Sequence, residues 1–194
     1  MLRERMGEDD FHYILYFQEP GVAEAELDPD PIATMRALLW GASGEAAKHR
    51  AAGGGSPPLG SAQTGFLPDT PVTQMPTWLS DGDLNAYAQA FARSGFAGGI
   101  NWYRNLDRNW ELTRPWRNAK LTVPAAFVGG RLDPVLTGTG DLDGDHMMMT
   151  VQSLFAPDLE VVLVDDAGHW VQQEQPGPVN AALLAFLGRV LPSG

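Results

Sequence analysis

The segment Val161–Trp170, VVLVDDAGHW, is the clearest indication of the fold class of this chain. Its β-branched and apolar residues predict a buried strand over Leu159–Val164, which is followed by two aspartates, an alanine, a glycine and His169. In open α/β sheets the reactive groups lie on loops at the carboxyl ends of the strands. A histidine at that place indicates acid–base chemistry, and the rest of the chain must supply its partners.

A second apolar run, Leu121–Val128, predicts another strand buried on both faces of a parallel sheet. It leads into a loop, Gly129–Asp133, and a helix is expected over Met147–Phe155, before the strand that precedes His169. A terminal helix is expected over Val179–Val190. The order strand–helix–strand–helix predicts two parallel strands joined by a right-handed crossover.

Asp133 and His169 each follow one of these strands, so their loops are expected at the same edge of the sheet. A carboxylate there can fix the tautomer of the imidazole and stabilise the imidazolium that forms when histidine takes a proton. Alternatively, Asp133 caps the turn before Pro134 and His169 is an ordinary loop histidine. The pairing is favoured because both residues occupy equivalent positions. Asp165 and Asp166 are weaker candidates for the same partner, since they lie on the same strand end as the histidine.

The chain before residue 115 predicts a mainly helical part. Asp30 and Pro31 have the pattern of a helix start. Ser80, with Asp83 three residues later, predicts a capping box, and Gly95 is expected to end that helix in a left-handed cap.

Two segments of this part are expected to be irregular. Phe11–Phe17 is interpreted as a short strand or a buried loop. Gly41–Gly65 is rich in Gly, Ala, Ser and Pro and is interpreted as an insertion or a mobile surface excursion without chemistry, with a flexible loop at Gly53–Pro58.

Tyr13 and Tyr103 are a second pair of interest. Two phenols that converge on one oxygen would stabilise developing negative charge there. Tyrosines in aromatic-rich segments are more often core residues, and Tyr16 competes with Tyr13 for the role.

Composition excludes several classes of protein. The 194 residues include 24 acidic and 13 basic ones, a net charge of −11, which disfavours nucleic acid or an anionic membrane as a partner. No cysteine is present, so disulfides and thiolate metal sites are excluded, and the scattered histidines predict no metal site and no cofactor. The first ten residues lack the apolar region of a secretory signal, and no apolar run is long enough to span a membrane. A cytoplasmic protein is therefore expected.

Four segments, taken in order, resemble the soluble epoxide hydrolases of the α/β-hydrolase superfamily, and above all their actinobacterial members. They are FHYILYFQEPGVAEAEL (11–27), SGFAGGINWYRNLDRNWE (94–111), FVGGRLDPVL (127–136) and DDAGHWVQQEQP (165–176). The YFQEPG and NWYRN motifs are specific to that family. An aspartate followed further along the chain by a GHW motif is shared by many α/β-hydrolases. The resemblance covers nearly the whole chain.

The resemblance implies a role for each residue that matches a family motif. Tyr13 and Tyr103 match the two lid tyrosines that polarise the epoxide oxygen. Asp133 matches the charge-relay acid, and His169 matches the base that activates water to hydrolyse an alkyl-enzyme ester. These four are the expected catalytic residues of a hydrolase that acts on ether bonds.

The implied fold is the C-terminal portion of an α/β-hydrolase: a helical lid, followed by the last two parallel strands and their flanking helices. Residues 1–114 are expected to form the lid with a lead-in segment, and residues 115–194 the C-terminal part of the hydrolase core. Phe17 and Trp102 are expected to line the substrate cavity, although core packing explains them equally well.

The family's nucleophile is expected on a Gly-x-Asp-x-Gly turn, and its oxyanion loop begins with His-Gly. Neither occurs in the 194 residues; Gly140–Gly144 has the glycine spacing but Leu142 at its centre. The sequence therefore predicts a truncated epoxide hydrolase, inactive alone, whose exposed strands would favour aggregation, a homo-oligomer or a complementing N-terminal half. The substrate would be a small apolar epoxide. The alternative is a non-catalytic lid module that binds an apolar ligand or a partner chain.

Overall fold

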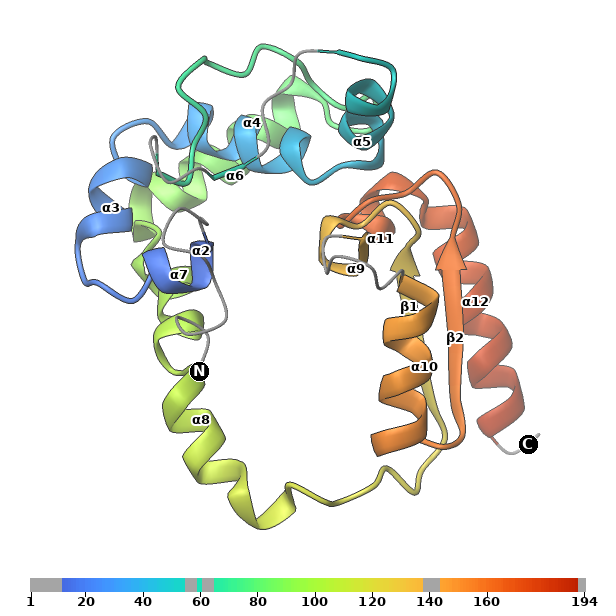
Figure 1. Ribbon diagram of the computed structural model, residues 1–194. Helices are drawn as coiled ribbons and strands as arrows, with labels where there is room; N and C mark the ends of the chain where they lie inside the picture. The colour runs from blue at the N-terminus through green and yellow to red at the C-terminus, as the bar shows by residue number, and fades with distance from the viewer. Residues whose placement is uncertain (1–11, 55–58, 61–64, 138–143, 192–194) are drawn as a thin grey trace. The chain divides into compact units, whose positions relative to one another are not determined.

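The computed structural model describes residues 12–54, 59–60, 65–137 and 144–191 (Figure 1). The chain divides into two compact units: residues 1–41 with 55–114, and residues 42–54 with 115–194. The N-terminal ten residues and most of the glycine-spaced segment 140–144 lie outside the described residues. The expected assignment of 1–114 to a lid and 115–194 to a hydrolase core stays a prediction.

The first unit is built from helices. In chain order they are α2 (Tyr13–Tyr16), α3 (Val22–Leu27), α4 (Pro31–Gly41), α6 (Asp81–Ser94), α7 (Ala97–Arg104) and α8 (Leu106–Thr113). α4 packs against α6, and the buried side chains of Met35, Leu39, Leu84 and Ala88 lie on these two helices. Burial of this apolar stripe is the main term that holds the unit together.

The helix signals read from the sequence are present in this unit. The Asp30 carboxylate accepts a hydrogen bond from the backbone N–H of Ala33 at the start of α4. Ser80 and Asp83 form the predicted capping box at the start of α6. Gly95 follows α6 with φ of 65°, but its ψ of 176° places it outside the left-handed helical region that was expected.

The interpretation of Phe11–Phe17 as a strand or loop was wrong. The described part of this segment is the one-turn helix α2, which begins after His12, whose Nδ1 accepts a hydrogen bond from Ile14 N. The Gln18 side chain donates to the carbonyl oxygen of Ile14 near the other end. These local contacts override the β propensity of the aromatic residues.

The second unit contains a parallel two-stranded sheet. β1 (Ala125–Gly130) pairs with β2 (Leu159–Val164) in a register that runs from Ala125 opposite Leu159 to Gly130 opposite Val164. Its helices are α5 (Gly44–Ala51), α9 (Pro134–Thr137), α10 (Gly144–Phe155), α11 (Val171–Glu174) and α12 (Pro176–Val190). Figure 1 shows α10 and α12 flanking the strands. The helix-rich chain with two parallel strands is the fold class that the sequence predicted.

One expected boundary in this unit was wrong, and one helix was missed. The strand begins at Ala125 rather than Leu121, because Pro124 has no N–H for pairing and the Leu121 N–H donates instead to the carbonyl oxygen of Phe155, 2.7 Å away. From the sequence, no helix was expected in Gly41–Gly65, but this segment contains α5. Ser43 caps α5 by accepting a hydrogen bond from Ala46 N, a signal that the surrounding glycines obscured.

The core of the second unit is small. Val164, Ala167, Val171 and Val179 are buried together where β2 meets α11 and the start of α12. Further along α12, Leu184 is 69% exposed, and Met149 on α10 is 66% exposed. Apolar surface is therefore open to solvent on both helices in this structure.

Candidate active site

His169 lies on the loop between β2 and α11, and Asp133 lies between β1 and α9. The two strands are parallel neighbours, so both loops leave the same edge of the sheet. Leu132 N donates to the carbonyl oxygen of Ala167 (2.8 Å) and Arg131 N donates to that of Val164 (2.9 Å), which ties the two loops together. The sheet and these bonds bring the imidazole and the carboxylate into contact.

The Nδ1 atom of His169 lies 3.0 Å from Oδ2 of Asp133 and 3.2 Å from Oδ1. Oδ1 also accepts a hydrogen bond from Val135 N at 2.8 Å, at the start of α9. Asp133 therefore does both things weighed from the sequence: it caps the turn and it contacts the histidine. With the Asp133 side chain 14% exposed and the His169 side chain 43% exposed, the acid is sheltered while the imidazole faces solvent.

The hydrogen bond to Asp133 is the main influence on the imidazole and raises the pKa of His169 above its ordinary value. Partial burial opposes this by lowering the pKa, while the charges of Asp133 and Glu174 raise it further. A carboxylate on Nδ1 selects the tautomer in which Nε2 carries a free lone pair. The arrangement suits a histidine that takes a proton at Nε2.

The other two candidate partners of His169 are engaged elsewhere. Asp165 forms an ion pair with Arg131 at 2.8 Å, and Asp166 forms one with Lys48 at 2.5 Å. Both aspartates are exposed, so these pairs contribute little to stability. Among the described residues, Asp133 is the carboxylate in hydrogen-bond contact with the imidazole of His169.

Tyr13 and Tyr103 lie together within the first unit. Their ring centroids are 5.4 Å apart and the rings are nearly perpendicular, at 86°. Phe17 and Phe66 complete an aromatic cluster, with the Phe17 centroid 5.2 Å from that of Tyr103 and 4.9 Å from that of Phe66. Edge-to-face packing of this kind holds both tyrosines in defined orientations.

Polar contacts brace the backbone around this pair. The Gln18 side chain donates to the carbonyl oxygens of Ile14 (2.8 Å) and Tyr103 (3.1 Å), which links α2 to α7. The Arg104 guanidinium donates through Nε to the carbonyl oxygen of Phe17 and forms a two-bond ion pair with Glu24. The contact between the tyrosines therefore rests on a network and not on ring packing alone.

Tyr16, the alternative to Tyr13 in the sequence analysis, makes a hydrogen bond to a different part of the first unit. Its hydroxyl donates to Oε2 of Glu26 at 2.8 Å, and the same carboxylate accepts hydrogen bonds from Phe66 N and Leu67 N. Burial, followed by the hydrogen bond and charge of Glu26, raises the pKa of Tyr16 to about 12. Tyr16 thus anchors the Phe66 segment of the cluster, which leaves Tyr13 as the tyrosine that contacts Tyr103.

The two expected cavity residues differ in their surroundings. Phe17 is 5% exposed inside the aromatic cluster, whereas Trp102 is 77% exposed on α7. Their role in lining a substrate cavity stays a prediction.

Three residues that the sequence did not single out support these pairs: Arg104 and Glu24 in the first unit, and Glu174 in the second. Arg104 follows Tyr103 directly in the NWYRN motif, which was the available signal. Glu174 lies five residues after His169 in α11, and its carboxylate contacts the backbone on both sides of the histidine. The Arg104–Glu24 ion pair joins residues that are 80 positions apart, and a single sequence does not show such contacts.

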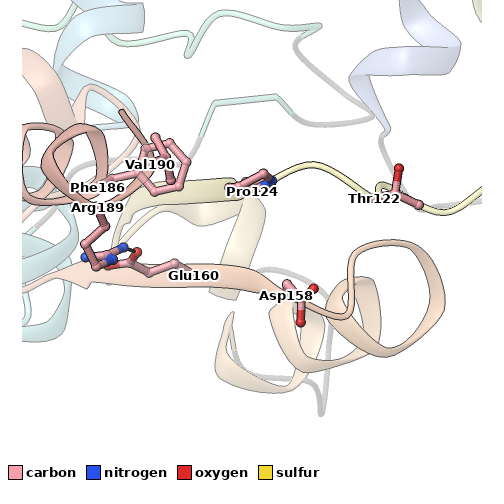
Figure 2. Close-up of a pocket in the computed structure, with 8 residues that line it drawn as sticks. Thr122, Pro124, Asp158, Glu160, Phe186, Arg189 and Val190 are labelled. Atoms are coloured by element: carbon pink, nitrogen blue, oxygen red, sulfur yellow. Dashed lines mark ion pairs between the residues drawn. The ribbon is translucent and has the colours of Figure 1, made fainter. Parts of the chain in front are cut away.

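The second unit also has a hollow of about 310 Å³ near the amino ends of the strands, away from His169 (Figure 2). Glu160 and Arg189 face each other there as an ion pair, and the Arg189 guanidinium lies 5.9 Å from the ring centre of Phe186. The charges of Glu160 and Arg189 therefore neutralise each other within the hollow.

Within the described residues, no group of three or more histidine, aspartate or glutamate side chains is arranged to hold a metal ion. No described helix combines the length and apolar character needed to cross a lipid bilayer.

Comparisons with known proteins give one consistent result. No protein-family model matches the chain. Epoxide hydrolase A of Mycobacterium tuberculosis is 44% identical over 189 residues, which is 95% of this chain and 54% of that protein. Epoxide hydrolase 2 of Siraitia grosvenorii is 34% identical over 183 residues, 92% of this chain and 53% of that protein. The crystal structure of Epoxide Hydrolase A from Mycobacterium thermoresistibile has a TM-score of 0.79 and 44% identity, and the match covers 99% of this chain and 56% of that one.

Two parallel strands carry a histidine and an aspartate in contact at one edge of the sheet, and the similar structures match nearly the whole chain. Together these findings define a protein of the α/β-hydrolase class. Within that class the chain belongs to the epoxide hydrolase family. It spans about half the length of the curated relatives it matches.

Proposed function

We propose that this chain acts in the hydrolysis of epoxides to vicinal diols. His169 is the base that activates water, Asp133 orients it, and Tyr13 and Tyr103 polarise the epoxide oxygen. The observation that carries the proposal is the 3.0 Å contact between His169 Nδ1 and Asp133 Oδ2. The names of the relatives support the same reaction.

The reaction begins with the opening of the epoxide. A nucleophilic carboxylate attacks a ring carbon, the bond from that carbon to oxygen breaks, and the oxygen gains negative charge. The hydroxyls of Tyr13 and Tyr103 donate hydrogen bonds to this oxygen, and one of them supplies the proton that makes it a hydroxyl. The 5.4 Å separation of the two ring centroids supports a shared task. The product of this step is an ester between enzyme and substrate.

His169 then promotes hydrolysis of that ester. Nε2 takes a proton from water while the resulting hydroxide attacks the ester carbonyl carbon. The acyl carbon–oxygen bond breaks, and the departing alkoxide takes the proton from the imidazolium to complete the diol. The carboxylic acid left behind loses a proton, which restores the phenol. Asp133 stabilises the imidazolium throughout, as its hydrogen bond to Nδ1 allows.

The nucleophile and the oxyanion donors are proposed to come from sequence outside these 194 residues, because neither motif occurs in them. A polypeptide of these residues alone is therefore expected to lack turnover. The same requirement gives the proposed partners: a small apolar epoxide and a segment that complements the second unit.

The test supplies the missing groups. The chain is mixed with, or fused to, the portion of the Mycobacterium thermoresistibile enzyme that it does not match, and diol formation from styrene oxide is measured. We expect turnover in the complemented protein, and in the His169→Ala variant we expect mass spectrometry to show a trapped covalent ester with no diol. Tyr103→Phe should slow ester formation, whereas Tyr87→Phe, a tyrosine on α6, should not.

Two results would overturn the proposal. Diol formation that is unchanged in His169→Ala would remove the histidine from the reaction. A complemented protein that binds styrene oxide but forms neither ester nor diol would favour the alternative, a non-catalytic module for apolar ligands.

A further inference from the structure

The carboxylate of Glu174 holds the backbone on both sides of His169. Oε2 accepts a hydrogen bond from Gly168 N at 3.0 Å, and Oε1 accepts one from Trp170 N at 3.1 Å. Oε2 also accepts a third, from Gly44 N at 2.8 Å. One charged side chain thus joins the histidine loop to the start of α5, and hydrogen bonds to a charged acceptor are the stronger kind.

The backbone of the histidine itself is held by the same neighbouring segment. His169 N donates to the carbonyl oxygen of Ala42 at 2.9 Å. The three consecutive amides at positions 168, 169 and 170 therefore all have protein acceptors. Rotation of this loop would break several of these bonds together, so the direction of the imidazole is set by its backbone as well as by Asp133.

Three glycines make this close junction possible. A Cβ on Gly168 would lie 2.5 Å from the carbonyl oxygen of Ala42, and one on Gly44 would lie 2.6 Å from that of Asp166. A Cβ on Gly130 would collide with the carbonyl oxygen of Gly168. The backbones approach each other too closely for any side chain, which indicates a rigid support.

We propose that Glu174 is a positioning residue for His169: its carboxylate fixes the amides that flank the histidine, so that Nδ1 stays on Asp133 and Nε2 stays directed at the water it activates. The part of this statement that concerns water rests on the proposed function. The part that concerns the imidazole does not depend on turnover.

The charge of Glu174 adds to this support. It raises the pKa of His169, after the larger effect of the hydrogen bond that His169 Nδ1 donates to Asp133. The other charged groups of the two loops are paired away from the ring, Asp165 with Arg131 and Asp166 with Lys48.

The first test needs no variant. In the 194-residue chain, NMR follows the side-chain carboxyl carbon of Glu174 and the amide protons of Gly44, Gly168 and Trp170 while the pH is lowered. If the carboxylate holds these amides, all three amide shifts move with the midpoint of the Glu174 carboxyl. Amide shifts that ignore this midpoint would overturn the proposal, and the measurement stands even if variants fold poorly.

The second test compares Glu174→Gln with Asp165→Asn. Both remove one negative charge near the histidine, but only the first replaces an oxygen that accepts from the loop amides. In Glu174→Gln we expect the hydrogen-exchange protection of the 168 and 170 amides to fall about tenfold or more and the His169 pKa to fall. Glu174→Asp, which keeps the charge, should restore part of the protection. Equal behaviour of Glu174→Gln and Asp165→Asn would contradict the positioning role.

A third measurement separates this inference from the proposed function. In the complemented enzyme, Glu174→Gln should slow ester hydrolysis, lower kcat and shift its pH profile, while the rate of ester formation stays unchanged. If the NMR results hold and diol formation does not depend on His169, the proposed function fails and the positioning of His169 stands. If diol formation needs His169 but the loop amides and the pH profile do not respond to Glu174, the positioning role fails alone.

Discussion

Replacement of Arg104 by methionine should loosen the segment that carries Tyr13 and Tyr103. The Arg104 guanidinium donates to both carboxylate oxygens of Glu24, at 2.5 and 2.9 Å, and to the carbonyl oxygens of Phe17 and Glu19. The side chains of Arg104 and Glu24 are only 15% and 16% exposed. Methionine keeps most of the length of the side chain and removes all of its donors.

The magnitude follows from the state of Glu24. The hydrogen bond from Arg104 lowers the pKa of Glu24 from 4.5 to about 2. That depression corresponds to about 3 kcal/mol of stability when the carboxylate is charged, and solvent screening reduces the expected loss to about 2 kcal/mol. Because the pKa is lowered in the folded state, this stabilisation is complete above pH 4.5 and is lost as the pH falls toward 2. The difference between wild type and variant should therefore shrink in acid.

The assay is hydrogen exchange at pH 6, read on peptides that cover α2 and α7. A local loss of about 2 kcal/mol lowers protection about thirtyfold. Arg108→Met, which removes an exposed arginine on α8, is the matched control and should leave protection unchanged. Unchanged protection in Arg104→Met, or a difference that does not shrink below pH 4.5, would contradict a stabilising role of the ion pair.

Three further outcomes are expected. Ser80→Ala removes the capping box of α6 and should cost about 1 kcal/mol, measured by the urea midpoint of unfolding. Gly130→Ala should destabilise the second unit by about 2 kcal/mol or more, because the added Cβ meets backbone atoms. Gly188→Ala, whose Cβ meets nothing within 4 Å, should instead stabilise α12 by roughly 0.5 to 1 kcal/mol. Equal thermal midpoints of the two variants would contradict this pair of predictions. Asp133→Asn should lower the pKa of His169, which proton NMR can follow. In the wild type, the protonated imidazole paired with Asp133 stabilises the folded state below pH 6.5, and this stabilisation is lost as the pH rises through the raised pKa; the variant should lack it. An unchanged titration of His169 would show that Asp133 does not act on the imidazole.

Secondary-structure elements with strong local signals were predictable from the sequence. The strand Leu159–Val164 and the helix that Ser80 starts follow from consecutive residues, since apolar runs and capping signals act locally. The segment Phe11–Phe17 was misread because its one-turn helix depends on contacts with His12 and Gln18 rather than on propensity. The helix α5 was missed because the segment Gly41–Gly65 around it is rich in glycine, serine and proline.

The candidate site residues were also predictable only in part. From the sequence alone, a histidine and an aspartate that follow two successive buried strands were expected at one edge of a parallel sheet, a placement that suits acid–base chemistry. The folded chain was needed to show that Asp133, and not Asp165 or Asp166, contacts the imidazole, and that Glu174 joins the histidine loop to Gly44. These contacts link segments that are far apart in the sequence, and such segments meet only when the chain is folded.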